Sequence, residues 1–466
     1  MERQPDNVKP VCKEGQDNDN NIDTAAVLQA ATRDVDSLAI GSCVKISARL
    51  EGATRSGNAS AKAPPPLGVE AAASKDDTDT GRHAADGQAA AGAVEGPDRA
   101  TGGDDTRCGK PCAEEVLNDE RAVLQILFDT CGGAFWRVRI AWGSAAPLMA
   151  WFGIGTCSGS GGEGKISKLA LPWNKLAGKI PSAIGTLSAL QELVLHDNLL
   201  SGSIPPELSK LSALQVLLLH SNTLKGEIPT DIGVLSSLRV VHLNDNQLTG
   251  SIPTSVGELS SLVELHLHNN KISGVIPRAI GRLASLRVLC LSNNQLTGEI
   301  PPEMGQLSSL VALALDGNKL SGPLPAELGQ LSNLQDLRLQ TNRLKGNIPA
   351  EIGRLGAACV IMLGQNQLEG PIPAKIGRAS SLEILDIQQN KLTGAIPAEI
   401  GNLTALRVLS LSENVLSGSI PAEMGRLTSL QMLRLANNML TGRLPPAVAE
   451  LTSLKVRQLD GNQLED

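Results

Sequence analysis

Tyrosine is absent from this 466-residue sequence, and aromatic residues of any kind are rare. The three phenylalanines and four tryptophans all lie between Phe128 and Trp173, so most of the chain has no aromatic side chain to place in a core. Leucine, isoleucine, valine and alanine must therefore supply nearly all of the buried surface. Glycine (47 residues) and proline (26 residues) together exceed average usage but stay below the fraction that indicates disorder throughout.

The sequence also lacks a long apolar run and an excess of basic residues. No segment reaches the roughly 18–20 consecutive apolar residues that a membrane-spanning helix needs. The net charge of −7 arises in residues 1–115, which hold 20 acidic and 13 basic side chains, so the remainder is neutral overall. A neutral chain has no basic surface with which to displace counterions from nucleic acid. We therefore expect neither a membrane span nor a nucleic-acid partner.

The N-terminus and the cysteines indicate a compartment. Residues 1–7 lack the basic-then-apolar pattern of a secretory signal. Eight cysteines occur without metal-site spacing, and the three residues between Cys108 and Cys112 are one too many for a redox or zinc pair. These features favour a reducing environment, so we expect a cytoplasmic protein with no bound cofactor or metal. An extracellular or plasma-membrane-associated protein is the alternative if the natural chain begins differently.

Residues 1–115 differ in composition from the rest of the chain. Alanine, glycine, aspartate and serine dominate, and residues 71–106 show no apolar periodicity. Such a segment cannot bury enough surface to offset its conformational entropy. We predict a mostly disordered, low-complexity acidic region over 1–115.

An asparagine recurs every 24 residues from Asn174 onward, without an insertion or deletion. A fixed short period indicates a solenoid, in which each unit buries its apolar face only against its neighbours. A carboxamide both donates and accepts, so a stacked column of asparagines can satisfy backbone groups at the turns of successive coils. We assign this asparagine ladder a structural role. Its members are Asn174, Asn198, Asn222, Asn246, Asn270, Asn294, Asn318, Asn342, Asn366, Asn390, Asn414, Asn438 and Asn462.

Each unit follows the same plan around its asparagine. Glycine stands four residues after the asparagine and proline seven residues after it in every complete unit. Ile232, Leu235 and Leu238 show the spacing of a helical or 3₁₀ turn, and Val241 and Leu243 alternate as in a strand with one buried face. Proline prevents helix or strand from continuing, and glycine permits a bend. One unit is therefore a short strand, an asparagine turn, a return and a brief helical segment, with the strands stacked in parallel.

The repeated pattern L-x-L-x-x-N-x-L-x-G-x-I-P-x-x-I-G, seen within Leu238 to Gly257 and its copies, resembles the plant-type leucine-rich repeat. The resemblance covers residues 166–466, as twelve full units and a partial last one. It implies an α/β repeat solenoid: a right-handed superhelix with a concave parallel β-sheet, a second short strand at the L-x-G-x-I-P segment and short 3₁₀ segments on the convex side.

Residues 116–165 resemble the N-terminal cap of algal and bacterial proteins with this repeat. The resemblance implies a helix over 116–130 that covers the first coil, with Val116, Val123 and Leu127 on its apolar face. The aromatic residues of this segment are interpreted as cap packing, with a ligand-binding aromatic patch as the alternative.

The concave face carries the residues that we expect to bind a partner. Side chains that alternate with the buried leucines of a strand point to the opposite face. The candidates are Glu192, His196, His220, His242, Asn244, Glu264, His266, His268, Asp316, Asp336, Arg338, Gln340, Asp386, Gln388 and Arg434.

Five of the six histidines fall in this set. Strands in a sheet lie about 4.8 Å apart, so His196 should neighbour His220, and His242 should neighbour His266. A metal site, or a pH-sensitive site for an anionic ligand, is one explanation. Duplication of units that happened to contain a Leu-His pair is the other.

No catalytic motif accompanies the repeats, since kinase signatures, a G-x-S-x-G elbow and H-E-x-x-H are all missing. The expected function is that of a non-enzymatic scaffold that binds a protein or peptide on its concave face. The alternative is the ligand-binding ectodomain of a receptor-like protein, or a secreted inhibitor of cell-wall-degrading enzymes, with any kinase or GTPase module absent from this chain. The array stops at Asp466 without a capping helix, so we also expect either self-association through that end or a truncated gene model.

Overall fold

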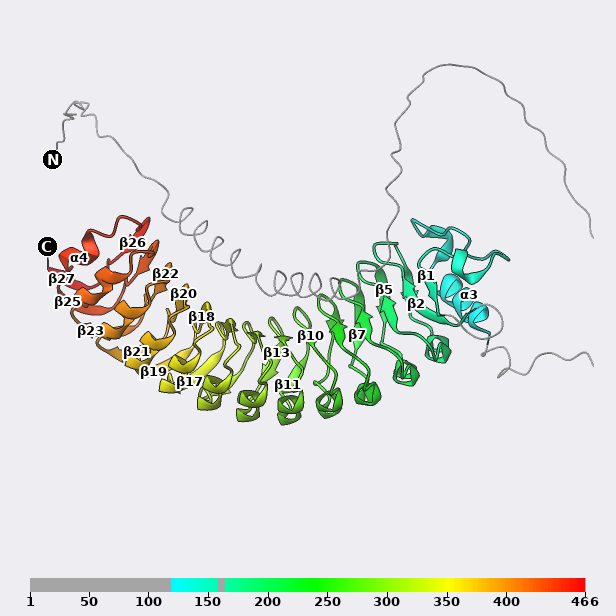
Figure 1. The fold of residues 1–466 in the computed structure, drawn as a ribbon, viewed down its shortest axis with the longest axis horizontal. Coiled ribbons are helices and arrows are strands. Elements are labelled where there is room, and N and C mark those ends of the chain that lie inside the picture. The colour runs from blue at the N-terminus through cyan, green and yellow to red at the C-terminus, as the bar shows by residue number, and fades with distance from the viewer. Residues whose placement is uncertain (1–118, 158–163, 466) are drawn as a thin grey trace, which may run out of the picture.

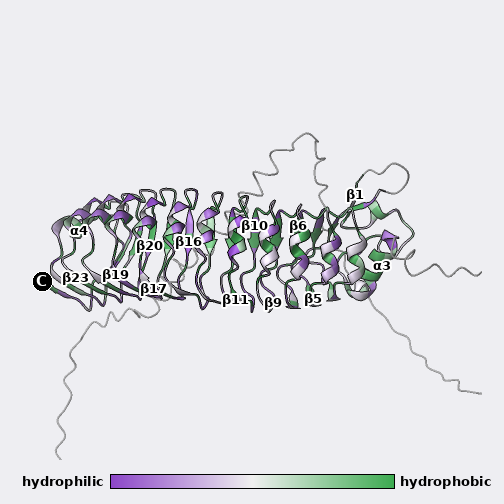
Figure 2. Ribbon diagram, turned by 90° about the horizontal axis from the view of Figure 1, so that it is seen from below, coloured by the Kyte–Doolittle hydropathy of each residue, from purple (hydrophilic) through white to green (hydrophobic). Residues whose placement is uncertain are grey.

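The computed structural model describes residues 119–157 and 164–465. The disorder predicted for 1–115, and the start of the predicted cap, lie outside the described residues. The chain forms one curved solenoid, in which successive coils stack side by side along an arc (Figure 1). Seen from below, the coils follow one another in a single row from the N-terminal helix to the C-terminal end (Figure 2). The predicted repeat solenoid with a parallel sheet is thus confirmed.

The inner face of the arc is one long sheet. In the part of the chain that the structure describes, this sheet has 14 strands, and all neighbours are parallel except the first pair. The strands, in order across the sheet, are β1 (Ile154–Thr156), β2 (Ile166–Ala170), β4 (Glu192–Val194), β6 (Val216–Leu218), β8 (Val240–His242), β10 (Glu264–His266), β12 (Val288–Cys290), β14 (Ala312–Ala314), β16 (Asp336–Arg338), β18 (Val360–Met362), β20 (Ile384–Asp386), β22 (Val408–Ser410), β24 (Met432–Arg434) and β26 (Val456–Gln458).

Residues 24 apart lie opposite each other at each parallel step of this sheet. Leu265 of β10, for example, pairs with Val241 of β8 and with Leu289 of β12. Because side chains alternate along a strand, the middle residue of each three-residue strand from β4 to β24 points into the coil and its two neighbours point to the concave side. The unbroken repeat period therefore sets the register of the whole sheet.

A second series of strands follows the asparagine turns, as the resemblance implied. In the described residues these strands form three shorter parallel sheets. They are β3 (Ala177–Lys179), β5 (Leu199–Gly202), β7 (Thr223–Gly226) and β9 (Gln247–Leu248), then β11 (Ser273–Val275) and β13 (Gln295–Thr297), then β15 (Ser321–Gly322), β17 (Arg343–Asn347), β19 (Gln367–Pro371), β21 (Lys391–Gly394), β23 (Val415–Gly418), β25 (Met439–Arg443) and β27 (Gln463–Glu465).

Short 3₁₀ helices line the outer edge of the arc (Figure 1). Each follows the repeated proline, which stands just before the helix and has no N–H to leave unsatisfied. In η6 the helix closes when the N–H of Leu235 donates to the carbonyl of Ile232. The helices of the array are η4 (Ser182–Thr186), η5 (Pro206–Lys210), η6 (Thr230–Val234), η7 (Thr254–Glu258), η8 (Arg278–Arg282), η9 (Pro302–Gln306), η10 (Ala326–Gln330), η11 (Ala350–Arg354), η12 (Ala374–Arg378), η13 (Ala398–Asn402), η14 (Ala422–Arg426) and the α-helix α4 (Pro446–Ala449).

The asparagine ladder runs inside the coils. The Oδ1 of Asn222 accepts from the N–H of Leu200 in the preceding coil at 2.9 Å. Its Nδ2 donates to the carbonyls of Leu195 at 3.0 Å and Leu219 at 3.1 Å. Each ladder amide from Asn198 to Asn438 makes these bonds to its own coil and the one before, whereas Asn174 bonds the backbone of Val138. An inward-facing carboxamide therefore connects every coil to its neighbour.

The N-terminal segment packs on the first coil of the array. Helix α3 (Glu120–Thr130) begins at Asp119, whose side chain accepts from the N–H of Arg121, and it contacts η4 and β3. It starts later than the predicted residue 116, and its buried face includes Val123 and Leu127. Two more 3₁₀ turns, η2 (Gly133–Phe135) and η3 (Leu148–Ala150), complete the segment.

The aromatic residues of this segment pack mainly on one another. The ring centroids of Trp136 and Trp142 lie 4.8 Å apart, and those of Trp142 and Trp151 lie 5.0 Å apart. Phe135 and Trp173 are instead largely exposed, at 82% and 60%. The first coil of the array has no preceding coil to cover its apolar surface. The packed aromatic residues at this end cover that surface instead.

Candidate functional site

The predicted binding residues lie in three columns on the concave sheet, two, four and six positions before a ladder asparagine. Each column advances by one strand per unit, so residues 24 apart are direct neighbours. The binding role itself stays a prediction.

Several of these residues are buried, although they lie on the face of the sheet that points away from the core. Glu264, His266, Asp336, Arg338, Asp386 and Arg434 all belong to residues that are 6% exposed or less. The cause is the narrow spacing of strands, which presses long side chains of adjacent units against one another. Glu192, in contrast, forms an ion pair with Lys168 at 2.5 Å, with both side chains well exposed.

The five histidines form a continuous cluster, as their spacing predicts. The rings of His196 and His220 stack with centroids 4.4 Å apart, and those of His242 and His266 lie 4.2 Å apart. His268 lies 5.7 Å from His266, centroid to centroid. Imidazoles this close cannot all carry a proton at low cost.

A buried carboxylate joins two of these rings. Oε2 of Glu264 lies 3.1 Å from Nε2 of His242 and 3.7 Å from Nε2 of His266. Burial alone would raise the pKa of Glu264, but hydrogen bonds to the two histidines hold it at about 2. Burial, together with the neighbouring imidazoles, lowers the pKa of His266 to about 4. At neutral pH the site therefore holds an ionised carboxylate beside a neutral imidazole.

His196 and His220 each contact the side chain of the residue that follows them in the sequence. Nδ1 of His196 lies 2.7 Å from Oδ2 of Asp197, and Nδ1 of His220 lies 3.2 Å from Oγ of Ser221. Burial lowers the pKa of His220 to about 4. Nδ1 of His268 is buried and has no hydrogen-bond partner among the described residues. Asn244 donates from Nδ2 to Asp245 at 2.7 Å.

The C-terminal half of the face contains two buried arginines that differ in their hydrogen-bond partners. Arg338 is bound by Asp336 on the same strand, with a contact of 2.8 Å from Nη2 to Oδ2. Nε and Nη2 of Arg434 are buried and have no hydrogen-bond partner within residues 119–157 and 164–465. Burial lowers the pKa of Arg434, and the negative charge of Asp386 opposes that shift. Leaving such donors unused is costly, so this guanidinium suits an incoming acidic group.

Other polar residues of this half interact across strands. Oγ of Ser292 donates to Oδ1 of Asp316 at 2.5 Å, and Oγ of Ser410 donates to Oε1 of Gln388 at 2.9 Å. The Oε1 of Gln340 is buried without a partner among the described residues.

Two sets of residues beside this face are not among the residues that the sequence predicts for the site. Cys290 is buried next to His266, and its position within its unit is the same as that of His242 and His266, which was the available signal. The residues just before the ladder asparagines adopt positive φ, at 53° for Asp245 and 54° for Asn269, and Nδ2 of Asn269 donates to Oδ1 of Asp245. Aspartate and asparagine tolerate this conformation better than most residues, which makes their recurrence there a recognisable pattern.

Family models match along the array. The model described as "Leucine-rich repeat region" matches residues 208–321 and 237–357, and models described as "Leucine rich repeat" match 380–440 and 189–211. Together with the solenoid these matches decide the family. The chain is a plant-type leucine-rich repeat protein.

Solved plant receptor ectodomains resemble this leucine-rich repeat protein. The ectodomain of the membrane receptor kinase GASSHO1/SCHENGEN3 from Arabidopsis thaliana, in complex with CASPARIAN STRIP INTEGRITY FACTOR 2, is 38% identical over 64% of this chain and 38% of its own, with a TM-score of 0.56. PEPR1 with AtPEP1 is 30% identical over 74% of this chain and 52% of its own, with a TM-score of 0.64.

A third relative is the ectodomain of the Arabidopsis receptor kinase HAESA with an extended IDA peptide hormone. It is 34% identical over 64% of this chain and 50% of its own, with a TM-score of 0.60. The leucine-rich repeat protein thus spans about half, or less, of the length of these ectodomains. No curated protein matches it in a sequence comparison.

These relatives contradict the expected cytoplasmic location. They are ectodomains of plant membrane receptors, which lie outside the cell. The scattered cysteines misled the expectation: Cys131, for example, is buried, and a buried structural thiol is inert, so it gives no evidence of a reducing compartment. No described helix combines the length and the apolar character needed to cross a membrane.

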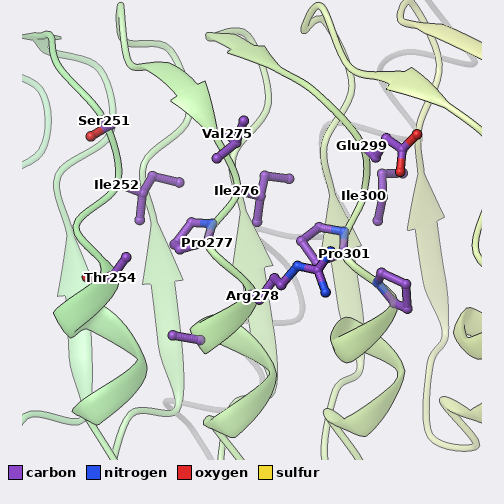
Figure 3. A pocket seen from close by; sticks show the side chains of 12 residues that line it. Ser251, Ile252, Thr254, Val275, Ile276, Pro277, Arg278, Glu299, Ile300 and Pro301 are labelled. Atoms are coloured by element: carbon purple, nitrogen blue, oxygen red, sulfur yellow. The ribbon is translucent and has the colours of Figure 1, made fainter.

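A groove of about 630 Å³ lies away from the concave face, between three successive coils of the leucine-rich repeat protein. Ile252, Ile276 and Ile300 occupy equivalent places along it, next to the 3₁₀ helices (Figure 3). Arg278 closes one side through an ion pair with Glu303 at 3.1 Å. The isoleucines themselves are buried, so the groove is mostly a gap between coils.

Proposed function

We propose that this protein is a non-enzymatic recognition module that binds a peptide or an extended protein segment on its concave face. The observation that carries this proposal is Arg434, a buried guanidinium on that face with unused donors. A carboxylate or another acidic group of the ligand would satisfy it.

The character of the face supports a peptide rather than a flat protein surface. The sheet is long and narrow, and its three concave columns, which mix polar and apolar side chains, run parallel to the axis of the solenoid. An extended ligand could contact several columns at once. One of the solved relatives named above, the HAESA ectodomain, is in complex with a peptide hormone, which agrees with this use of the fold.

The structural resemblance favours the receptor-like alternative over a free scaffold. We therefore propose that the chain acts outside the cell, as the ligand-binding part of a receptor-like protein. Asn402, in the sequence Asn-Leu-Thr, is exposed at the end of η13 and would be available for N-glycosylation there.

Selection of a displayed random-peptide library against the full chain tests the recognition proposal. Recovered peptides should be rich in aspartate and glutamate. Arg434→Gln should lower their binding affinity by about 10-fold or more, as expected for the loss of a charge-assisted bond. Arg278→Gln, on the outer side, is the matched control and should bind as the parent does. Peptides that bind the Arg434→Gln chain unchanged would refute the proposal.

Glycosylation tests the location. The protein from its natural source should lose mass on endoglycosidase treatment. A chain with Asn402→Gln and Asn58→Gln, which removes the other N-x-S/T sequence as well, should not. An unmodified Asn402 in the natural protein would count against extracellular exposure.

A further inference from the structure

Three side chains of adjacent strands converge at the middle of the histidine cluster. His242 ends β8, and Glu264 and His266 begin and end β10. One ligand atom from each lies within 4.8 Å of the others. The side chains are 11%, 5% and 6% exposed, so water competes little for these donors.

Their spacing suits a small tetrahedral ion. Zinc binds histidine nitrogen at about 2.0–2.1 Å and carboxylate oxygen at about 2.0–2.2 Å, which places neighbouring ligand atoms of a tetrahedron about 3.3–3.5 Å apart. The two measured separations from Oε2 of Glu264, 3.1 and 3.7 Å, bracket that value. Two imidazoles and one carboxylate are also a ligand set that zinc sites use.

Two further donors adjoin the same histidine. Ligand atoms of His268 and Cys290 lie within 4.8 Å of each other and of His266. Nδ1 of His268 is buried without a hydrogen-bond partner among the described residues. These two donors group with His266 but not with His242 and Glu264, so water would complete the coordination of an ion held by the first three side chains.

We propose that His242, Glu264 and His266 bind one zinc ion on the concave face, linking strands β8 and β10. This site is independent of the peptide-recognition proposal, which rests on Arg434. Its structural effect would be to tie two coils together at their inner edge, since the ion takes ligands from both.

A second group in the described part of the chain, His196, Asp197 and His220, also has metal-ligand atoms within 4.8 Å. Its members are more exposed, and the nearer nitrogens of both histidines already contact Asp197 and Ser221. We therefore assign zinc to the buried group. The exposed group supplies a matched control, with the same number of histidines on the same face.

The test is a zinc titration of the full chain, freed of any histidine tag, by calorimetry with a competing chelator. We expect one zinc per chain. His242→Ala with His266→Ala should weaken binding by more than about 100-fold, because loss of outer-shell partners alone costs 10–100-fold. His196→Ala with His220→Ala should leave the affinity unchanged.

Two further measurements keep the test decisive if the double variant folds poorly. Glu264→Gln preserves shape and should still weaken zinc by about 10-fold or more. Cobalt should give the intense visible absorption of a tetrahedral site in the parent chain and not in Glu264→Gln. Absence of zinc binding by the parent chain, equal affinity in Glu264→Gln, or loss of binding only in the His196/His220 variant would overturn the proposal.

Discussion

Asp336 and Arg338, two residues apart on strand β16, form a two-point ion pair on the concave sheet: Nε and Nη2 of Arg338 donate to the two carboxylate oxygens of Asp336 at 2.9 and 2.8 Å. Both side chains are almost fully buried. Removal of one partner leaves a buried charge, while removal of both does not.

Asp336→Ala should therefore reduce the free energy of unfolding by about 3–5 kcal/mol. Asp336→Leu with Arg338→Met, which replaces the pair by apolar groups, should cost much less. Urea unfolding of the three chains checks this. A double variant as unstable as the single one would contradict it.

The asparagine ladder predicts a large effect from a single amide. Asn222→Ala removes the acceptor of the Leu200 N–H and the donor to Leu195 and Leu219. Each buried group left without a partner costs about 1–3 kcal/mol, so the free energy of unfolding should fall by about 3 kcal/mol or more. Asn402→Ala, at an exposed position, is the control and should change it by less than about 0.5 kcal/mol. Equal denaturation midpoints would show that the ladder contributes nothing.

Close contact between coils makes one glycine of a unit irreplaceable and another neutral. A Cβ on Gly353 would lie 1.9 Å from the carbonyl oxygen of Lys375 in the next coil, whereas a Cβ on Gly356 would meet no atom within 4 Å. Gly353→Ala should lower the melting temperature by several degrees, because the backbone of the next coil must move. Gly356→Ala should leave it unchanged or raise it slightly. Thermal unfolding of the two chains gives the answer, and similar melting temperatures would refute the contact argument.

Stability should depend on pH through Asp316. Burial raises the pKa of this carboxyl group in the folded chain, despite the hydrogen bond from Ser292. A group whose folded-state pKa is raised stabilises the fold below its unfolded pKa, and that contribution is lost as pH rises through the folded value.

Asp316→Asn should accordingly raise the melting temperature at pH 7 and change it little at pH 3, where the parent carboxyl is protonated. The amide oxygen can still accept from Ser292. Melting curves of both chains at the two pH values test this, and a variant that is less stable at pH 7 would contradict the sign.

The architecture was predictable because a repeat of constant length leaves few choices. Once Asn222 and Asn246 are equivalent, so are Val216 and Val240, and a parallel register follows. The neighbour relations of the histidines follow from the same arithmetic, and the structure has them.

The hydrogen-bond partners of the buried side chains in the candidate site could not be predicted in this way. Alternation indicates that Arg338 and Arg434 share a face, but it does not say that one meets Asp336 while the other keeps unused donors. That difference depends on which side chain occupies each neighbouring position, and on rotamers that no periodicity specifies. Cys290 is the next member of the column that contains His242 and His266, a relation that the spacing of cysteines along the sequence does not reveal.

The constant offset of 24 residues between paired strands has a consequence for how such proteins change over time. Gain or loss of one whole coil leaves every remaining partner in place, while gain or loss of a single residue displaces all the inward leucines of that coil. Lineages can therefore lengthen or shorten the recognition surface in steps of one strand without redesigning the core. Diversity in this architecture should accumulate as copy number and as exchanges in the three concave columns, with the interior held nearly constant.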